Sequence, residues 1–286
     1  MSYKDLQMIK RVGIIGQGFV GRALKEAFSP YYQVHTYDKF LDEVSTHSSI
    51  TDLCHSCDAV FVCVPTPMNK DGSCNISIVE QVCLEATDAG NNHLVVIKST
   101  VPPGTTTLLN EKFNTNQIVF NPEFLTERFA SQDFKNTNRV LLGGDIKATT
   151  ILKQFYSHVF PNVTVIKTDS PIAEYVKYLS NCFLATKVSV ANEFAAMCEA
   201  DGVDYDKVCE YACFDPRLGN THWVVPGPDG KRGFGGSCFP KDMNAIIHFA
   251  NQMGIPCHTM RGAWQTNLEV RPEKDWEQLK GRAVVE

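Results

Sequence analysis

The residues best suited to covalent chemistry lie near the end of the chain, in the run GFGGSCFPKD from Gly233 to Asp242. Its three glycines give a loop that can hold its backbone close to a ligand. Ser237 is a typical N-cap residue, so the pattern predicts a helix that begins beside Cys238. The helix dipole and the nearby Lys241 would both favour the thiolate, which is the nucleophilic form, and Asp242 could act as a base or as an orienting group. The alternative is a buried structural cysteine, the usual fate of this residue type.

A second pattern lies near the N-terminus, where Gly16, Gly18 and Gly21 form a GxGxxG motif. The motif follows a strand-like run, Arg11–Ile15, and opens a helix-like stretch, which is the context of a dinucleotide-binding turn. The first glycine permits the turn, the second lets a pyrophosphate approach the helix N-terminus, and the third lets helix and strand pack closely. Asp38 ends the second strand, where a carboxylate binds the adenosine ribose and would repel a 2′-phosphate, so NAD is expected rather than NADP. The alternative is a glycine turn that binds no nucleotide.

An NAD site and a nucleophilic cysteine together indicate a class of reaction. Hydride transfer oxidises an alcohol to an aldehyde, a thiolate can add to the aldehyde, and a second hydride transfer leaves a thioester that water hydrolyses to an acid. No metal site is expected. Cys54 and Cys57 form a lone CxxC pair, for which we favour small buried hydrophobic residues over a zinc or redox site.

The elements that must position these residues fall into two parts. The first part alternates apolar runs with amphipathic stretches, which predicts an α/β fold with a Rossmann-like, doubly wound parallel sheet covered on both faces. From Ser170, which could cap the helix, to about Ala200, apolar residues recur at helical spacing without a glycine. This predicts a helix of roughly 45 Å that joins domains or forms an oligomer interface. We therefore expect an NAD-binding domain at residues 1–169 and an all-α domain, carrying Cys238, at residues 170–286.

The expected elements follow from the same periodicities. The strands are expected at Arg11–Ile15, Gln33–Tyr37, Ala59–Val64, His93–Ile97, Gln117–Phe120, Val140–Gly143 and Val163–Lys167. Helices are expected at Val20–Phe28, Ile76–Ala89 and Lys147–Ser157 in the first part, and at Asp206–Cys213, Pro240–Gln252 and Thr259–Glu269 after the long helix.

Composition excludes several classes of protein. The chain has 286 residues, of which 43% are hydrophobic, enough for the core of one large domain or two ordinary ones. A net charge of −5 without a long basic block argues against nucleic acid as the main partner. No apolar window has the length of a membrane helix, so no membrane partner is expected. The eleven cysteines, an odd number without an export signal, predict reduced thiols in a cytoplasmic protein.

Six segments occur in an order that resembles one family. They are the GxGxxG motif, VPTP from Val64, KSTVPPGTT from Lys98, NPEFLTE from Asn121, ExxKYLSN from Glu174, and GFGGSCFPKD. The set is similar to the UDP-glucose/GDP-mannose dehydrogenase family, from about Arg11 to the C-terminus. The resemblance implies NAD-dependent, two-step oxidation of a nucleotide-sugar substrate at C6, in nucleotide-sugar metabolism and polysaccharide biosynthesis. It also implies a homodimer formed through the helix at 170–200.

The resemblance assigns catalytic roles residue by residue. Cys238 resembles the thioester-forming nucleophile, and Asp242 resembles the carboxylate that assists proton transfer with a water. Lys177 and Asn181, spaced i, i+4, would share one face of the long helix. The resemblance makes them stabilisers of the oxyanion that develops at C6.

Other residues of these motifs would surround the reacting groups. Thr100 resembles the hydroxyl that positions water, Glu123 the acid/base of aldehyde handling and thioester hydrolysis, and Glu127 a cofactor contact. Arg217 resembles an arginine that contacts the sugar nucleotide, in some members across the dimer. Further cofactor contacts are expected from Gly16, Gly18, Phe19, Val20, Gly21, Asp38, Lys39, Val64, Pro65, Thr66, Ser99 and Lys241. Further substrate contacts are expected from Phe234, Gly235 and Gly236.

The chain departs from the family pattern at two places. The connection from Asn220 to Gly233 is longer than expected and adds Trp223, Lys231 and Arg232. Trp223 could cover a sugar or a base, or pack on the loop, and the cationic pair could meet a diphosphate. Family members continue into a second Rossmann-like domain that holds the nucleotide of the substrate. Asp275–Glu286 resembles the lead-in to that domain, which we expect to be absent.

Two other functions stay open. A single-step β-hydroxyacid dehydrogenase would suit two domains and this length, but such enzymes rely on a lysine and need no cysteine nucleophile. A regulatory or assembly subunit could bind NAD without catalysing a reaction.

Overall fold

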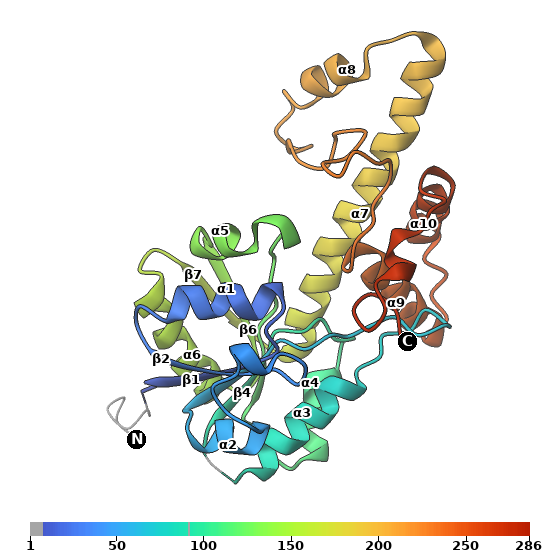
Figure 1. The fold of residues 1–286 in the computed structure, drawn as a ribbon. Helices are drawn as coiled ribbons and strands as arrows, with labels where there is room; N and C mark the ends of the chain where they lie inside the picture. Colours follow the sequence, from blue (N-terminus) through green and yellow to red (C-terminus); the bar gives the residue numbers. More distant parts are fainter. Residues whose placement is uncertain (1–7, 91) are drawn as a thin grey trace. The chain divides into compact units, whose positions relative to one another are not determined.

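The computed structural model describes residues 8–90 and 92–286, in two compact units (Figure 1). The first comprises the residues up to Thr66 and Ile76–Lys177, and the second comprises Pro67–Asn75 and Tyr178–Glu286. The helix α7 (Ser170–Asp201) begins in the first unit and ends in the second. Residues 1–7, part of the segment in which no export signal is expected, lie outside the described residues.

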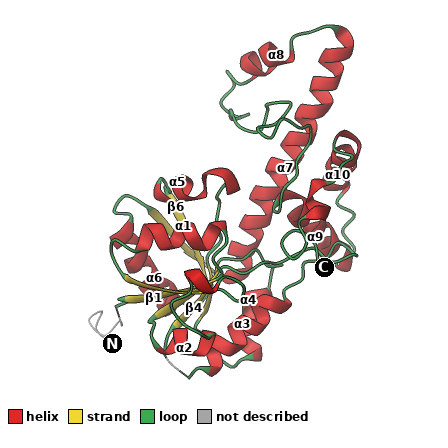
Figure 2. Ribbon diagram, viewed as in Figure 1, coloured by secondary structure: helices red, strands yellow, loops and turns green. Residues whose placement is uncertain are grey.

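The first unit holds a seven-stranded sheet in the order β2-β1-β3-β4-β5-β6-β7. Figure 2 draws its strands in yellow. Its strands are β1 (Arg11–Ile15), β2 (Gln33–Tyr37), β3 (Ala59–Val62), β4 (Leu94–Ile97), β5 (Ile118–Phe120), β6 (Arg139–Gly143) and β7 (Thr164–Thr168). Strands β1 to β5 run parallel, which confirms the expected Rossmann-like sheet. β6 joins β5 antiparallel, and β7 runs parallel to β6. This reversal could not be predicted, because a strand buried on both faces shows the same apolar run in either direction.

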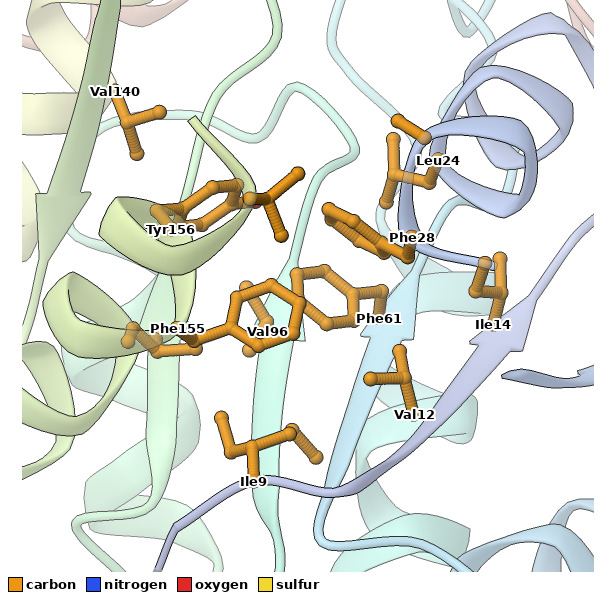
Figure 3. Close-up of a cluster of buried hydrophobic side chains, with 14 of the residues drawn as sticks. Ile9, Val12, Ile14, Leu24, Phe28, Phe61, Val96, Val140, Phe155 and Tyr156 are labelled. Carbon is orange, nitrogen blue, oxygen red and sulfur yellow. The ribbon is translucent and has the colours of Figure 1, made fainter. Parts of the chain in front are cut away.

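Helices cover both faces of the sheet, as the alternating pattern predicts. One face is covered by α1 (Phe19–Phe28), α5 (Ala130–Lys135) and α6 (Ile146–Val159). The other is covered by α2 (Ile50–His55), α3 (Ser77–Asp88) and α4 (Thr105–Lys112). On the first face the rings of Phe28, Phe61 and Phe155 meet edge-on or tilted, with centroids 4.8–5.7 Å apart (Figure 3). Burying each such ring is worth roughly 1.5–3 kcal/mol, so this cluster is a main source of the unit's stability.

The strand order fixes where a ligand can bind. From β1 the chain moves to β2 on one side and then returns to β3 on the other, so the order reverses between β1 and β3. Crevices at such reversals, beyond the carboxyl ends of the strands, are where open α/β sheets bind nucleotides. Three loops leave adjacent strands at this edge: the GxGxxG turn after β1, residues 63–66 after β3, and residues 98–104 after β4.

The second unit is helical. Besides the later part of α7 it contains α8 (Tyr205–Ala212), α9 (Phe239–Gln252) and α10 (His258–Val270), followed by the short 3-10 helix η4 (Asp275–Gln278). Tyr178 of α7, Met243 of α9 and Ala263 of α10 belong to one hydrophobic core together with Phe234. The helices α8, α9 and α10 each lie within a few residues of the predicted positions. None of the helices in the described part of the chain is long and apolar enough to cross a membrane.

Ser170 differs from its predicted role. It is the first residue inside α7 rather than the residue before it, and its hydroxyl lies 3.1 Å from the hydroxyl of Thr107. The start of the long helix was predicted correctly to within one residue, but the prediction that Ser170 is its N-cap was wrong.

Candidate active site

The glycine turn after β1 has three glycines with three different surroundings. Gly16 has a φ of +91°, and a Cβ built on it would lie 2.5 Å from the carbonyl oxygen of Cys63. A Cβ on Gly21 would lie 2.0 Å from the carbonyl oxygen of Gly16, so a side chain there would push helix α1 away from the turn. Gly18, which directly precedes α1, has open space around its Cβ position. Only at Gly18 does the turn leave room for a ligand, which suits the pyrophosphate of a dinucleotide.

Asp38 is joined to this turn. Its carboxylate accepts a hydrogen bond from the backbone N–H of Gln17 at 2.7 Å and one from the N–H of Phe40 at 2.9 Å. The carboxylate predicted to bind ribose therefore lies against the glycine motif. Lys39 is exposed, with its ammonium 5.9 Å from the Phe40 ring.

The loops after β3 and β4 are tied together. The hydroxyl of Ser99 donates to the carbonyl of Val64 at 2.6 Å. Thr66, Ser99 and Thr100 are all buried, whereas Pro65 is exposed. Phe19 and Val20 lie in the first turn of α1, half-buried. All predicted cofactor contacts of the first unit lie in these loops or beside the glycine turn, except Glu127, which is exposed at the start of η3 (Glu127–Phe129).

Glu123 and Lys177 form a buried ion pair within the first unit. The Lys177 ammonium lies 2.9 Å from the Glu123 carboxylate and also donates to the Glu123 carbonyl at 2.6 Å. Burial alone would raise the pKa of Glu123, but Lys177, the Leu125 N–H and Lys98 outweigh burial and lower it. Glu123 is therefore ionised at neutral pH and can accept a proton.

Lys98 is a buried residue without a predicted role, and it lines a cavity with Glu123. Its ammonium is buried and donates to the side-chain oxygen of Asn121 at 3.0 Å, which also accepts from the Tyr156 hydroxyl at 2.5 Å. Burial lowers the pKa of Lys98 to about 8. Lys98, Asn121, Glu123 and Tyr156 line one cavity with Arg139. The available signal was a lysine directly after the apolar run of β4, where a charge is expensive to bury.

Glu174 is a second unexpected residue. Its fully buried carboxylate accepts hydrogen bonds from the N–H groups of Gly104 and Thr106, at 2.6 and 2.9 Å, and from the Thr106 hydroxyl at 2.6 Å. A residue of α7 thus caps the start of α4, where a negative charge is favoured. The bonds fix the end of the loop that carries Thr100 against α7.

Cys238 occupies the N-cap position of α9 in the second unit. Ser237, predicted to be this cap, lies one residue earlier, and its hydroxyl is 3.8 Å from the Cys238 sulfur. The prediction was wrong by one residue, and the consequence favours the chemistry. A cysteine at the N-cap lies at the positive end of the helix dipole, which favours a thiolate, although its sulfur accepts no capping hydrogen bond from the helix.

Asp242 joins two predicted site residues beside Cys238. Its carboxylate is buried and accepts hydrogen bonds from Lys241 at 2.5 Å and from the Asn181 amide at 2.7 Å. Burial alone would lower the pKa of Lys241, but Asp242 and the thiols of Cys74 and Cys238 outweigh burial and raise it. Lys241, predicted to contact the cofactor, is thus a protonated partner of Asp242.

Lys177 and Asn181 lie one turn apart on α7, the spacing from which a shared helix face was predicted. Each donates to a different carboxylate: Lys177 to Glu123 and Asn181 to Asp242. The donors predicted to stabilise an oxyanion are therefore both held by carboxylates.

Two of the three glycines before Cys238 make room for neighbouring side chains rather than for a ligand. A Cβ on Gly233 would lie 2.4 Å from the side-chain oxygen of Asn267, which accepts a hydrogen bond from the Phe234 N–H at 2.7 Å. A Cβ on Gly235 would lie 2.5 Å from the Arg271 guanidinium. Only Gly236, with a φ of +72°, has open space at its Cβ position. The Phe234 side chain is buried in the core, so only its backbone could meet a substrate.

The predicted substrate-side cations and Trp223 have partners within the protein. Arg217 is exposed and pairs with Asp215, two residues before it. The indole N–H of Trp223 donates to the Gly219 carbonyl at 2.9 Å, and the Lys187 ammonium lies 4.6 Å from the indole ring. These two contacts support the second of the two roles left open for Trp223, packing on its own loop.

Lys231 and Arg232 are likewise paired with acids. Lys231 lies 3.1 Å from Glu273, and Arg232 lies 2.7 Å from Glu199. A diphosphate at this cationic pair would have to compete with both carboxylates.

The lone CxxC pair is part of the core. Cys54, in α2, and Cys57, just after it, are buried among apolar side chains, and burial raises the pKa of each thiol to about 12. Within residues 8–90 and 92–286, no group of three or more histidine, cysteine or acidic side chains is arranged to hold a metal.

Comparison with known proteins assigns the chain to a class. The sequence profile of the NAD binding domain of the UDP-glucose/GDP-mannose dehydrogenase family matches residues 38–160, and that of the family's central domain matches residues 172–269. UDP-glucose 6-dehydrogenase TuaD of Bacillus subtilis is 31% identical over 301 aligned positions, covering 92% of this chain and 64% of that protein. The UDP-glucose dehydrogenase of Pyrobaculum islandicum is 30% identical with a TM-score of 0.83, covering 98% of this chain and 72% of that one.

A third protein shares the fold of this chain. The 3-hydroxyisobutyrate dehydrogenase of Mycobacterium tuberculosis gives a TM-score of 0.74 at 16% identity, covering 93% of this chain and 95% of that one. At that identity the likeness concerns the fold alone.

The Rossmann-type sheet, its glycine turn and the helical unit that follows define a two-unit, NAD-binding dehydrogenase fold. The chain belongs to the UDP-glucose/GDP-mannose dehydrogenase family and carries that family's NAD-binding domain. It spans less than two thirds of the length of the curated Bacillus relative.

Proposed function

We propose that this protein uses NAD to oxidise C6 of a nucleotide sugar twice, to the uronic acid, with Cys238 as the nucleophile. The position of Cys238 at the N-cap of α9, beside the bonded group Lys241, Asp242 and Asn181, carries this proposal. UDP-glucose is the first candidate substrate, since the relatives named above act on it by name.

Bound NAD would supply the hydride acceptor for each oxidation. The open position at Gly18 would face its pyrophosphate and Asp38 its ribose. The Cys238 thiolate would add to the C6 carbonyl carbon of the aldehyde, and the same sulfur would carry the thioester after the second oxidation. Asp242, held between Lys241 and Asn181, would pass protons to and from a water at C6.

Glu123 and Lys177 would serve the hydrolytic half of the reaction. The Glu123 carboxylate, held by the Lys177 ammonium at 2.9 Å, would take a proton from the water that cleaves the thioester, with Thr100 positioning that water. Lys177 and Asn181 would turn from their carboxylates toward the developing oxyanion at C6. The other predicted contacts, including Glu127 and Arg217, belong to the same proposal.

The test is a substrate screen combined with replacement of the cysteine. UDP-glucose, UDP-N-acetyl sugars and GDP-mannose are each incubated with the protein and NAD, and NADH is followed by absorbance. We expect one of them to give NADH and a uronic acid. Cys238→Ala should abolish acid formation, and Cys238→Ser should accumulate a covalent ester-like adduct visible by intact mass. Cys257→Ala, also at a half-buried cysteine, is the matched control and should keep its activity.

Two outcomes would replace this proposal. Turnover of a small hydroxy acid with one NADH per molecule, insensitive to Cys238→Ala, would indicate a single-step dehydrogenase that relies on a lysine. NAD binding without turnover of any substrate, and with no effect of Cys238→Ser on any property, would indicate a non-catalytic subunit.

We include a homodimer through α7 in the proposal. Within the second unit, Leu179, Phe183, Phe194 and Met197 recur at helical spacing and are 50–70% exposed. Such a stripe on one helix is typical of an interface. Light scattering should give twice the chain mass, and Phe183→Glu should give the monomer.

We also include a reducing compartment such as the cytoplasm in the proposal, which the odd number of cysteines supports.

A further inference from the structure

A buried arginine lies behind the loop that carries Cys238. Arg271 follows α10, and only 2% of its side chain is exposed. Its guanidinium donates to Asp275 at 2.6 Å, to Asp229 at 2.6 Å and to the carbonyl of Arg232 at 3.2 Å. Each of its three nitrogens thus has an acceptor, which is what a buried guanidinium requires.

One side of this cluster fixes the backbone before Cys238. The second oxygen of Asp275 accepts the N–H of Gly236 at 3.1 Å. The guanidinium packs so closely on Gly235 that a Cβ there would lie 2.5 Å from Arg271 and 2.4 Å from Asp275. The two residues that precede Ser237 and Cys238 are therefore held by side chains from beyond α10.

The other side of the cluster reaches the long connection between Asn220 and Gly233. Asp229 lies in this connection, and its carboxylate accepts from Arg271 with one oxygen and from the Lys231 N–H, at 3.1 Å, with the other. Burial alone would raise the pKa of Asp229 and of Asp275, but the hydrogen bonds from Arg271 lower both. Both carboxylates are ionised at neutral pH, so Arg271 forms an ion pair with each of them.

We propose that Arg271, held by Asp229 and Asp275, is a positioning residue that fixes the Gly235–Gly236 backbone and thereby keeps Cys238 at the N-cap of α9. The long connection then supplies Asp229, the second carboxylate that holds the guanidinium. This inference rests on the proposed function in one respect, that Cys238 is the reactive thiol.

The experiment compares two substitutions that each remove one exposed charge. Asp229→Asn breaks one arm of the cluster, and Glu273→Gln removes a carboxylate whose ion-pair partner is Lys231. The two side chains are 41% and 38% exposed, so neither change should prevent folding, which thermal unfolding checks. The readout is the rate of Cys238 alkylation by iodoacetamide at neutral pH, followed by mass spectrometry of the Cys238 peptide.

We expect Asp229→Asn to slow alkylation of Cys238 by about tenfold, less than the roughly hundredfold that a 1 Å misplacement of a reacting group can cost. The reason is that a loosened loop places the thiol at the helix N-terminus less often. Glu273→Gln should stay within about twofold of the wild type, as charge changes on exposed side chains have small effects. Asp229→Glu, which keeps the charge, should restore most of the rate. In turnover, Asp229→Asn should lower kcat and leave the KM for NAD unchanged.

Two results would overturn the inference: an unchanged alkylation rate in Asp229→Asn, or equal slowing in Asp229→Asn and Glu273→Gln. Alkylation needs neither NAD nor a sugar nucleotide, so it decides the role of Arg271 even if the proposed function fails. Conversely, acid formation that survives Cys238→Ala would refute the proposed function without changing the alkylation result.

Discussion

The two glycine-rich loops of this protein look alike in sequence and are built differently. In the turn after β1, glycines at 16 and 21 let main chain approach main chain, and Gly18 faces open space. In the loop before α9, glycines at 233 and 235 make room for the side chains of Asn267 and Arg271. The first loop packs against main chain, including the Cys63 carbonyl after β3, and the second is shaped by side chains that follow it by more than thirty residues in the chain.

This difference fits the proposal that one loop binds the cofactor and the other holds the reactive thiol. A pyrophosphate needs bare backbone N–H groups, which a local turn provides. A nucleophile must be held in one place, which bonds from a packed helix provide. The same residue type therefore signals ligand approach in one loop and side-chain packing in the other.

The largest effect is expected from removing a side chain that shapes the second loop. Asn267 is fully buried, accepts from the Phe234 N–H at 2.7 Å and donates to the Phe234 carbonyl at 3.0 Å. Asn267→Ala leaves both backbone groups unpaired and should cost about 3 kcal/mol of unfolding free energy, measured by urea denaturation. The exposed Asn251→Ala is the control and should cost less than about 0.5 kcal/mol. Equal costs would mean that the loop does not depend on Asn267.

An intermediate effect on the unfolding free energy is expected in the first loop, where glycine is replaced by alanine at two positions. Gly21→Ala places a Cβ 2.0 Å from the Gly16 carbonyl, and overpacking of this kind costs roughly 1–3 kcal/mol. Gly18→Ala meets no atom within 4 Å, and its φ of −69° suits alanine, so its unfolding free energy should change little. NAD binding, measured by calorimetry, should nonetheless weaken in Gly18→Ala. Full NAD affinity in that variant would contradict the role given to the open position.

The smallest effect is on the pH dependence of the unfolding free energy. It distinguishes His93, which directly precedes β4, from Asp275 in the cluster around Arg271. Burial lowers the pKa of His93, so protonation favours the unfolded chain, and stability falls as the pH drops below the ordinary histidine pKa of about 6.5. The loss is at most about 1.4 kcal/mol per pH unit, and His93→Leu should remove it. For Asp275, whose pKa is lowered, the contribution is complete above about pH 3.9 and is lost only in stronger acid. Urea denaturation at pH 7 and 5.5 checks this, and identical pH dependence in wild type and His93→Leu would contradict it.

The sequence predicted the elements that depend on local periodicity. The strands around the glycine turn, the long helix and the helix after Cys238 all lie within a few residues of their expected positions. The GxGxxG turn was predictable in detail, because its glycines make room for main chain or for a ligand and are set out in one short sequence motif.

What could not be predicted depends on contacts between distant segments. Lys98 and Glu174 find their hydrogen-bond partners only when β4 and α7 place them against Asn121 and the start of α4. Arg271 follows Gly235 by 36 positions in the printed sequence, and no local pattern links the two. The cap of α9 was misplaced by one residue, because serine is a preferred N-cap residue and cysteine is not.

The central claim is that the NAD-binding unit and the cysteine unit together carry out two oxidations of one substrate. Its most direct test is the ratio of NADH formed to nucleotide sugar consumed, measured to completion with the sugar nucleotide that the screen identifies. We predict a ratio of two in the wild type and no uronic acid in Cys238→Ala. A ratio of one, with the same product made by wild type and Cys238→Ala, would contradict the claim.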